Sequence, residues 1–158
     1  MQEKKTEKLT PQQALLKAAN YCAYQERCHE EVREKLGEWG IYGNDREEII
    51  LQLIQQNYLN EERFAKAFAG GKFRTKHWGR IKITLELKAR NVTDYCINKA
   101  MKEIPGDEYS KVLNELAEEK FRSEKDRNVL VKRNKTAQFL IGKGFEPEMV
   151  WDVLRNFA

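Results

Sequence analysis

Three short strings decide the fold class of this chain: KLGEWGI at residues 35–41, ELKARNV at residues 86–92 and FLIGKGF at residues 139–145. In each string a leucine is followed four positions later by glycine or asparagine (Gly40, Asn91 and Gly144), and then by an apolar residue. Glycine and asparagine tolerate the positive φ that ends many helices, and the apolar residue after them folds back onto the last turn. The sequence therefore predicts three copies of one kind of helix end.

Each of these helix ends is followed by the start of another helix, for which Asp45, Thr93 and the pair Glu146 and Pro147 are the predicted caps. Apolar spacing of three and four predicts a further helix before each pair, over residues 11–24, 61–76 and 107–125. The fold class is therefore all-α, an elongated tandem array of three three-helix repeats with helix-turn-helix-like units. The predicted divisions are a disordered tail at 1–10 and repeats at 11–59, 60–105 and 106–158.

The helix predicted over residues 79–90 carries two apolar stripes. Ile81, Leu85 and Ala89 form one stripe, and Ile83 with Leu87 forms the other. Two stripes are expected on a helix that is packed on both sides. We therefore expect this helix in the middle of the array, with Lys82, Glu86 and Arg90 on its remaining exposed face.

Length and composition exclude several classes of protein. The chain has 158 residues, of which 41% are hydrophobic and 34% charged, and such a chain folds without disulfide or metal support. Its longest apolar runs are far shorter than the roughly 20 residues that cross a bilayer, and its first residues do not have the pattern of a secretory signal. Three cysteines without a CxxC pair indicate reduced core thiols. We expect a cytoplasmic monomer without membrane contact.

No pattern in the sequence predicts catalysis or a cofactor. Cys28 and His29 are adjacent, so on a helix they point about 100° apart and do not form a nucleophilic pair. The cysteines and the two histidines match no common zinc spacing, and Phe73 stands where a phosphate loop would need Ser or Thr. The paired glutamates recur with the spacing of a solvated helix face. We expect a protein that is not an enzyme and has no metal or cofactor.

The charge is unevenly distributed, although the net charge of the chain is only +4. Residues 24–62 carry four basic against ten acidic side chains, residues 63–90 carry nine against one, and residues 117–135 carry seven against four. Such asymmetry directs association with charged partners more than it stabilises a fold. We therefore expect an anionic partner surface, either nucleic acid or acidic protein, opposite the middle repeat.

Basic and aromatic residues alternate between positions 72 and 80, next to Gly79. Such interleaving suits phosphate neutralisation and stacking on bases, although Phe73 and Trp78 could also fill the core between repeats. The candidate residues for binding a partner or DNA are Lys72, Arg74, Lys76, Trp78, Arg80, Lys82, Lys88, Arg90, Arg127, Lys132, Arg133 and Lys135.

Several of these stretches resemble the RecX family, the regulators of the bacterial RecA recombinase, over nearly the whole chain from Pro11 to Phe157. The opening motif of the family is similar to Ala14-Leu15, EVREKL at residues 31–36 and Gly40. Its second motif is similar to YLNEERFA at residues 58–65. Its third motif is similar to WGRIKI at residues 78–83, followed by Glu86-Leu87 and Val92. Asn60 and Glu61 replace the paired aspartates of the family, so the resemblance does not extend to a contact that needs both; Asn60 can still cap a helix. Asn91 replaces the usual glycine.

The resemblance implies a tandem of three-helix repeats that acts by binding and has no catalytic group. It implies a protein that lies in the groove of the RecA filament, spans neighbouring protomers and damps ATP hydrolysis and strand exchange, within recombination, DNA repair and the SOS response. Some members of the family also contact DNA.

A second hypothesis is a stand-alone helical protein that binds DNA or RNA directly through the basic cluster. The last helices of the repeats are poor readers of DNA for this purpose, because acidic residues such as Glu47, Asp94 and Glu148 lie near their starts. An enzyme is the third and least favoured alternative.

Overall fold

Residues 8–158 are described by a computed structural model of the chain, and within this range they form nine α-helices and no strand. The helices are α1 (Pro11–Tyr24), α2 (His29–Glu38), α3 (Gly43–Gln55), α4 (Glu61–Lys76), α5 (Arg80–Ala89), α6 (Asp94–Met101), α7 (Gly106–Ser123), α8 (Val129–Gly142) and α9 (Pro147–Leu154). The predicted leading helices at 11–24 and 61–76 agree with α1 and α4, and the third is shifted by one residue at its start and ends at Ser123 instead of residue 125.

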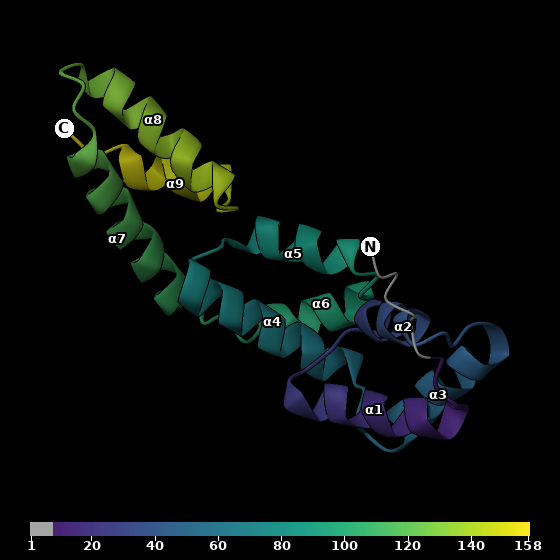
Figure 1. Cartoon of the computed structure of the whole chain (residues 1–158). Helices are drawn as coiled ribbons and strands as arrows, with labels where there is room; N and C mark the ends of the chain where they lie inside the picture. The colour runs from purple at the N-terminus through teal and green to yellow at the C-terminus, as the bar shows by residue number, and fades with distance from the viewer. Residues whose placement is uncertain (1–7) are drawn as a thin grey trace, which may run out of the picture.

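The helices pack in three groups, α1–α3, α4–α6 and α7–α9, which we call units 1, 2 and 3. The principal helix contacts between residues 8 and 158 are all within these groups. Figure 1 shows the units following one another along an elongated body, with unit 1 and the end of unit 3 at opposite extremes. This arrangement confirms the predicted tandem of three-helix repeats. We propose residues 11–59, 60–105 and 106–158 as the bounds of the units.

The three repeated strings end helices in the predicted way. Gly40, Asn91 and Gly144 have φ values of 79°, 58° and 98°. The next residue in each case, Ile41, Val92 or Phe145, is buried, and its N–H donates to the carbonyl oxygen of the leucine in the same string at 2.9–3.2 Å. These are the hydrogen bond and apolar contact of a Schellman helix end. Three local signals therefore specify three helix ends correctly.

The predicted helix starts are correct in part. Thr93 caps α6, since its hydroxyl accepts from the N–H of Cys96 at 3.4 Å. Asn60 caps α4 through the N–H of Arg63 at 2.9 Å, as expected. Asp45 is not the cap of α3: this helix begins at Gly43, so Asp45 lies in the first turn, where its charge faces the positive end of the helix dipole. Gly43 and Asn44, which precede the expected cap, therefore lengthen α3 at its start.

The start of the chain is described from Lys8 onward, so most of the tail predicted over residues 1–10 lies outside the described residues. The N–H of Leu9 donates to the carbonyl oxygen of Trp39 at 3.1 Å, and Thr10 forms a capping box with Gln13. Pro11 is the first residue of α1, where its missing N–H costs no helical hydrogen bond. Leu9 therefore ties the start of α1 to the end of α2, and Thr10 caps α1 locally.

The apolar core is divided unequally between the units. Unit 1 has a core of its own, formed around Val32, Leu36 and Leu53. Units 2 and 3 share one continuous core that includes Phe73, Tyr109 and Phe145, and among the described residues of unit 1 only Cys28 is buried in it. Units 2 and 3 are therefore one packed body.

The contact between units 2 and 3 also includes the backbone. The N–H of Gly79 donates to the carbonyl oxygen of Lys143 at 2.8 Å, and the N–H of Ile81 donates to that of Gly144 at 3.0 Å. The two glycines approach so closely that a Cβ on Gly79 would lie 2.2 Å from the carbonyl carbon of Gly144. The linker between α4 and α5 is thus fixed against the turn between α8 and α9.

The prediction that α5 is packed on both sides is wrong. Ile83 and Leu87 are fully buried in the shared core, but Ile81 is 42% exposed, Leu85 62% exposed, and Ala89 is exposed as well. Lys82 and Glu86, which were expected on the exposed face, are half-buried. The three-unit body covers one stripe of α5 and leaves the other free.

Candidate partner-binding surface

The predicted basic cluster begins on the last two turns of α4. Lys72 is half-buried, whereas Arg74 and Lys76 are exposed and have no ion-pair partner among the described side chains. Cations at this end of a helix are favoured by the helix dipole. His77 then ends α4 with a φ of 54°, which turns the chain toward Trp78 and α5. Arg74 and Lys76 are therefore the two freely presented charges at this corner.

Three further cations surround a pair of aromatic rings next to this corner. The rings of Phe68 and Trp78 meet edge to face, with centroids 6.3 Å apart. The Nζ atoms of Lys72 and Lys82 lie 5.0 and 4.5 Å from the centroid of the Trp78 ring, and the Cζ atom of Arg90 lies 4.8 Å from that of Phe68. Cation–π contacts of this kind hold long side chains in place. The structure thus brings together candidate residues that lie up to 18 positions apart in the sequence, from Lys72 to Arg90.

Phe68 was not predicted as part of this surface. It lies one helical turn before Lys72 on α4, and this i, i+4 spacing is the signal in the sequence that could have placed its ring beside that cation. Trp78 is half-buried, and Phe73 is fully buried in the core, so of the two aromatic residues in the basic stretch only Trp78 reaches the surface.

Arg80 serves the junction of units 2 and 3. Its guanidinium pairs with the carboxylate of Glu146 at 3.0 Å and lies 3.9 Å from the ring centroid of Tyr109. The Tyr109 hydroxyl donates to Glu146 at 2.6 Å and accepts the N–H of Arg80 at 3.1 Å. Burial, together with the neighbouring Glu146 carboxylate, raises the pKa of Tyr109, so the hydroxyl keeps its proton as donor. The charge of Arg80 is therefore largely satisfied within the protein.

The cations predicted on α8 lie apart from the cluster. Figure 1 shows the start of α8 at the far end of the molecule, whereas its last turn reaches unit 2. Lys132 lies over the Phe121 ring at 4.2 Å, Arg133 donates to the carbonyl oxygen of Phe157, and Lys135 is 3.9 Å from Asp126. Arg127 is exposed. The structure therefore separates the candidate residues into a cluster on unit 2 and a distal group on unit 3, and these do not form one continuous site.

The remaining candidate, Lys88, lies on α5 of unit 2 and is exposed.

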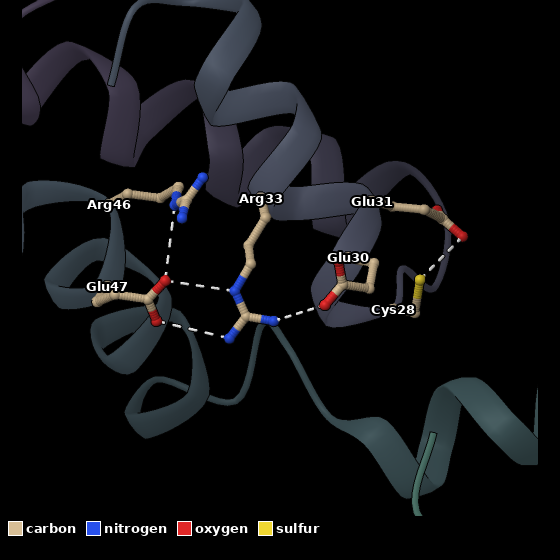
Figure 2. A network of polar contacts seen from close by, with 6 residues as sticks. All are labelled: Cys28, Glu30, Glu31, Arg33, Arg46 and Glu47. Carbon is tan, nitrogen blue, oxygen red and sulfur yellow. Dashed lines mark hydrogen bonds and ion pairs between the residues drawn. The ribbon is translucent and has the colours of Figure 1, made fainter. Parts of the chain in front are cut away.

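The acidic stretch of unit 1 is partly neutralised by internal ion pairs. Figure 2 shows the guanidinium of Arg33, a residue of α2, 2.9 Å from Glu30 of the same helix and 3.3 Å from Glu47 of α3. The Arg33 guanidinium lowers the pKa of Glu47. Six of the ten acidic side chains between residues 24 and 62 take part in such pairs: Glu26, Glu30, Glu31, Glu38, Glu47 and Glu62. Fewer carboxylates of this stretch are therefore unpaired than its sequence suggests.

The thiols are placed as core residues. Burial raises the pKa of Cys22 and of Cys28 to about 11, and it also raises the pKa of Cys96. Cys28 donates to a Glu31 carboxylate oxygen at 3.4 Å (Figure 2), and this carboxylate disfavours a neighbouring thiolate. Across residues 8–158, no group of three His, Cys, Asp and Glu side chains is arranged to hold a metal ion.

We expect these thiols to react slowly in the folded protein. A thiol with a pKa of about 11 is ionised in only about one molecule in 1,000 at pH 8, and burial restricts access further. With a chromogenic aromatic disulfide at pH 8, fewer than one thiol per chain should react within minutes, and all three should react at once in 6 M guanidinium chloride. Fast reaction of Cys22 or Cys28 in the native state would contradict their assignment to the core.

Two family models match the part of the chain that forms units 2 and 3. The model described as RecX, second three-helix domain, matches residues 60–101, and that described as RecX, third three-helix domain, matches residues 107–154. The chain belongs to the RecX family. The matched ranges include the whole of α4–α6 and the greater part of α7–α9.

Curated RecX proteins are similar to most of this chain. The regulatory protein RecX of Bacillus cytotoxicus is 27% identical over 139 residues, which cover 88% of this chain and 52% of that protein. The regulatory protein RecX of Geobacillus kaustophilus is 25% identical over 143 residues, covering 90% and 53%. The chain thus spans about half the length of the curated RecX proteins it matches.

Solved RecX structures have the same fold. The crystal structure of RecX from Lactobacillus salivarius superposes with a TM-score of 0.82 at 25% identity and covers 92% of this chain and 94% of that one. A second crystal structure, of a regulatory protein RecX, has a TM-score of 0.83 at 20% identity and covers 92% and 71%. In the described part of this RecX chain, no helix is long and apolar enough to cross a membrane.

Proposed function

We propose that this protein is a non-enzymatic, mainly negative regulator of the RecA recombinase in recombination, DNA repair and the SOS response. It binds in the groove of the RecA–DNA filament in the cytoplasm, as a monomer, and damps ATP hydrolysis and strand exchange. The observation that carries this proposal is the basic, partner-free end of α4 on the middle unit of an elongated RecX-family array.

The architecture supports binding along a filament. Units 2 and 3 share one core and are joined by backbone hydrogen bonds, so contacts made by each unit are held at a fixed separation. Two modest contacts joined by a rigid body bind far more tightly than either contact alone. An elongated body of three units therefore suits a partner with repeated subunits, because it can contact neighbouring protomers together.

The charge of unit 2 supports an anionic contact. Arg74 and Lys76 are exposed at the end of α4, next to the cations held by Phe68 and Trp78. Exposed charges of one sign accelerate association with an oppositely charged surface and orient the encounter. Filament DNA or an acidic surface of the recombinase would meet this corner of the protein.

A stand-alone nucleic-acid-binding protein is the second candidate function. The cations around the Phe68 and Trp78 rings favour it, because aromatic rings with flanking cations can bind single strands. The last helix of each unit argues against duplex reading, since Asp45, Asp94 and Glu148 stand in the first turns of α3, α6 and α9. Binding to DNA without recombinase, weakening steeply with salt, would favour this second function.

We expect the double variant Arg74→Glu and Lys76→Glu to weaken regulation about tenfold or more without unfolding the protein. Both side chains are exposed, so the reversal removes attraction and adds repulsion at the partner surface. The measurement is ATP hydrolysis by RecA on single-stranded DNA at increasing concentrations of the protein. The matched control is Lys17→Glu with Lys111→Glu, which changes the net charge equally at exposed positions of α1 and α7.

The two possible failures of this experiment have different meanings. If the wild-type protein leaves ATP hydrolysis unchanged at stoichiometric ratios, the proposed function is wrong. If the wild type inhibits and the Arg74 and Lys76 variant inhibits equally, the function stands and the end of α4 is only solvated surface. Unchanged helical circular dichroism of both variants is the check on folding.

A further inference from the structure

The exposed face of α5 carries an apolar stripe that nothing in the described chain covers. Ile81, Leu85 and Ala89 follow one another at i, i+4 and i+8, so they lie on one side of the helix. Ile81 is 42% and Leu85 62% exposed, while Ile83 and Leu87 on the opposite side are fully buried. Contiguous exposed apolar surface of this kind marks interaction sites more often than isolated apolar residues do.

A groove continues this stripe toward α6 and unit 3. It has a volume of about 410 Å³ and is lined by Arg80, Ile81, Thr84, Leu85, Met101 and Glu146. Its polar end is the pair of Arg80 and Glu146, whose charges are already satisfied by each other and by Tyr109. Apart from the Thr84 hydroxyl, the rest of its wall is aliphatic or thioether, so the groove favours an apolar side chain over a charged one.

The charges beside the groove are positive. On the helical wheel Lys82 and Lys88 lie on either side of the stripe, and neither has an ion-pair partner among residues 8–158. Glu86, the one acidic residue of α5, is paired with Arg90 at 2.9 Å and does not offset them. An occupant that complements this face has apolar anchors flanked by carboxylates.

The composition of the face favours a protein occupant over a nucleic acid. Ile81, Leu85 and Met101 are aliphatic or thioether side chains without a flat ring on which a base could stack. Apolar side chains at a spacing of one helical turn are the usual contacts of an amphipathic helix laid in a groove. The charge of this face and the spacing of its apolar side chains therefore both favour an amphipathic helix with acidic flanks.

We propose that the outer face of α5, formed by Ile81, Leu85, Ala89 and the groove to Met101, docks the apolar side of an acidic amphipathic helix. This inference rests on the proposed function, because the helix is taken to belong to a protomer of the recombinase filament. The protein then has two separate contacts on unit 2: a polar one at the end of α4, and an apolar one on α5.

The test is the double variant Ile81→Ser and Leu85→Ser, with Leu51→Ser on α3 as the matched control. Leu51 is 53% exposed, similar to the two tested residues, and lies on unit 1, away from the groove. Binding of each protein to RecA filaments assembled on single-stranded DNA is measured by biolayer interferometry. Loss of two apolar anchors should weaken the affinity of the double variant by about tenfold or more, while the control stays within about twofold of the wild type.

Charge-reversal variants test whether the occupant is an acidic helix. Lys88→Glu should weaken filament binding about three- to tenfold, because an acidic helix would then face a like charge, whereas Lys111→Glu on α7 should not. Binding of both variants to single-stranded DNA without recombinase should equal that of the wild type. Chemical unfolding of Ile81→Ser with Leu85→Ser should give a midpoint close to that of the wild type, since both side chains lie on the exposed face of α5 and outside the core.

Each other outcome overturns the inference in a distinguishable way. If wild-type protein does not bind the filaments, the proposed function fails and the docking site fails with it. If wild type binds and the serine variant binds equally, only the docking site is wrong. If Lys88→Glu weakens binding to naked DNA, the face contacts nucleic acid instead; if wild type is a dimer by light scattering and the serine variant a monomer, the occupant is a second copy.

Discussion

Replacing Gly79 with alanine should abolish the native contact between units 2 and 3 and destabilise the protein by about 3 kcal/mol or more. A Cβ at this position would lie 2.2 Å from the carbonyl carbon of Gly144 and 2.3 Å from its oxygen and from the nitrogen of Phe145. All three are backbone atoms, so the clash cannot be relieved by rotating a side chain. Relief requires α5 and the turn before α9 to separate, which breaks the hydrogen bonds that Gly79 and Ile81 donate.

The matched control is Gly71→Ala. Gly71 lies inside α4, and a Cβ there would meet no atom within 4 Å. Alanine is favoured over glycine inside a helix, so this variant should gain about 0.5–1 kcal/mol. Urea unfolding followed by circular dichroism measures both changes. Equal midpoints for Gly79→Ala and wild type would show that the two turns are not in contact in solution.

Gly144→Val should destabilise the same contact from the other side. Gly144 has a φ of 98°, and its Cβ would lie 2.6 Å from the backbone nitrogen of Lys82. A β-branched residue resists positive φ even without a clash. An unchanged melting temperature for this variant would be inconsistent with the helix end described for α8.

Glu146→Ala should destabilise the protein by about 2–3 kcal/mol, because it leaves two partners unsatisfied at the junction of units 2 and 3. Glu146 accepts from Arg80 at 3.0 Å and from the Tyr109 hydroxyl at 2.6 Å. Tyr109 is fully buried, so its hydroxyl has no access to bulk water as a replacement. Glu146→Gln keeps an acceptor for the Tyr109 hydroxyl but loses the negative charge, so it should lower the free energy of unfolding by less than Glu146→Ala does.

Asp152→Ala is the control for this second result. Asp152 also pairs with an arginine, Arg155, at 2.9 Å, but both side chains are mostly exposed. Exposed ion pairs contribute little to folding stability, so the free energy of unfolding of this variant should stay within about 0.5 kcal/mol of the wild-type value. The same urea titrations compare all three variants. Equal losses for Glu146→Ala and Asp152→Ala would mean that the Arg80, Tyr109 and Glu146 group does not stabilise the junction.

Local signals explain why most of the fold could be predicted. The ends of α2, α5 and α8 follow from glycine or asparagine with an apolar residue after it, and the starts of α1, α4 and α6 from Thr10, Asn60 and Thr93. These features depend on atoms within a few residues of one another. Asp45 failed as a cap because the helix begins three residues earlier than expected, at Gly43, with Tyr42 as its N-cap.

The contacts between units could not be predicted in the same way. An apolar stripe shows that a surface is apolar, but it does not say whether the chain itself covers it, so Ile81 and Leu85 were wrongly expected in the core. Arg80 was expected to contact a partner, yet it pairs with a residue 66 positions later. The cations between residues 63 and 90 were visible as a group, whereas the separation of the α8 cations from them required the structure.

The division of the core has a mechanical consequence. Unit 1 holds its own core and joins unit 2 through the buried Cys28 and through polar contacts, among them Arg63 with Glu26 and with the carbonyl oxygens of Asn57 and Tyr58. Units 2 and 3 are instead joined by a common core and by backbone hydrogen bonds. Under load, the body should therefore behave as a stiff rod with one compliant joint, at the start of α4. If the protein binds a filament as proposed, a change in filament pitch would flex this joint and leave the spacing between units 2 and 3 unaltered.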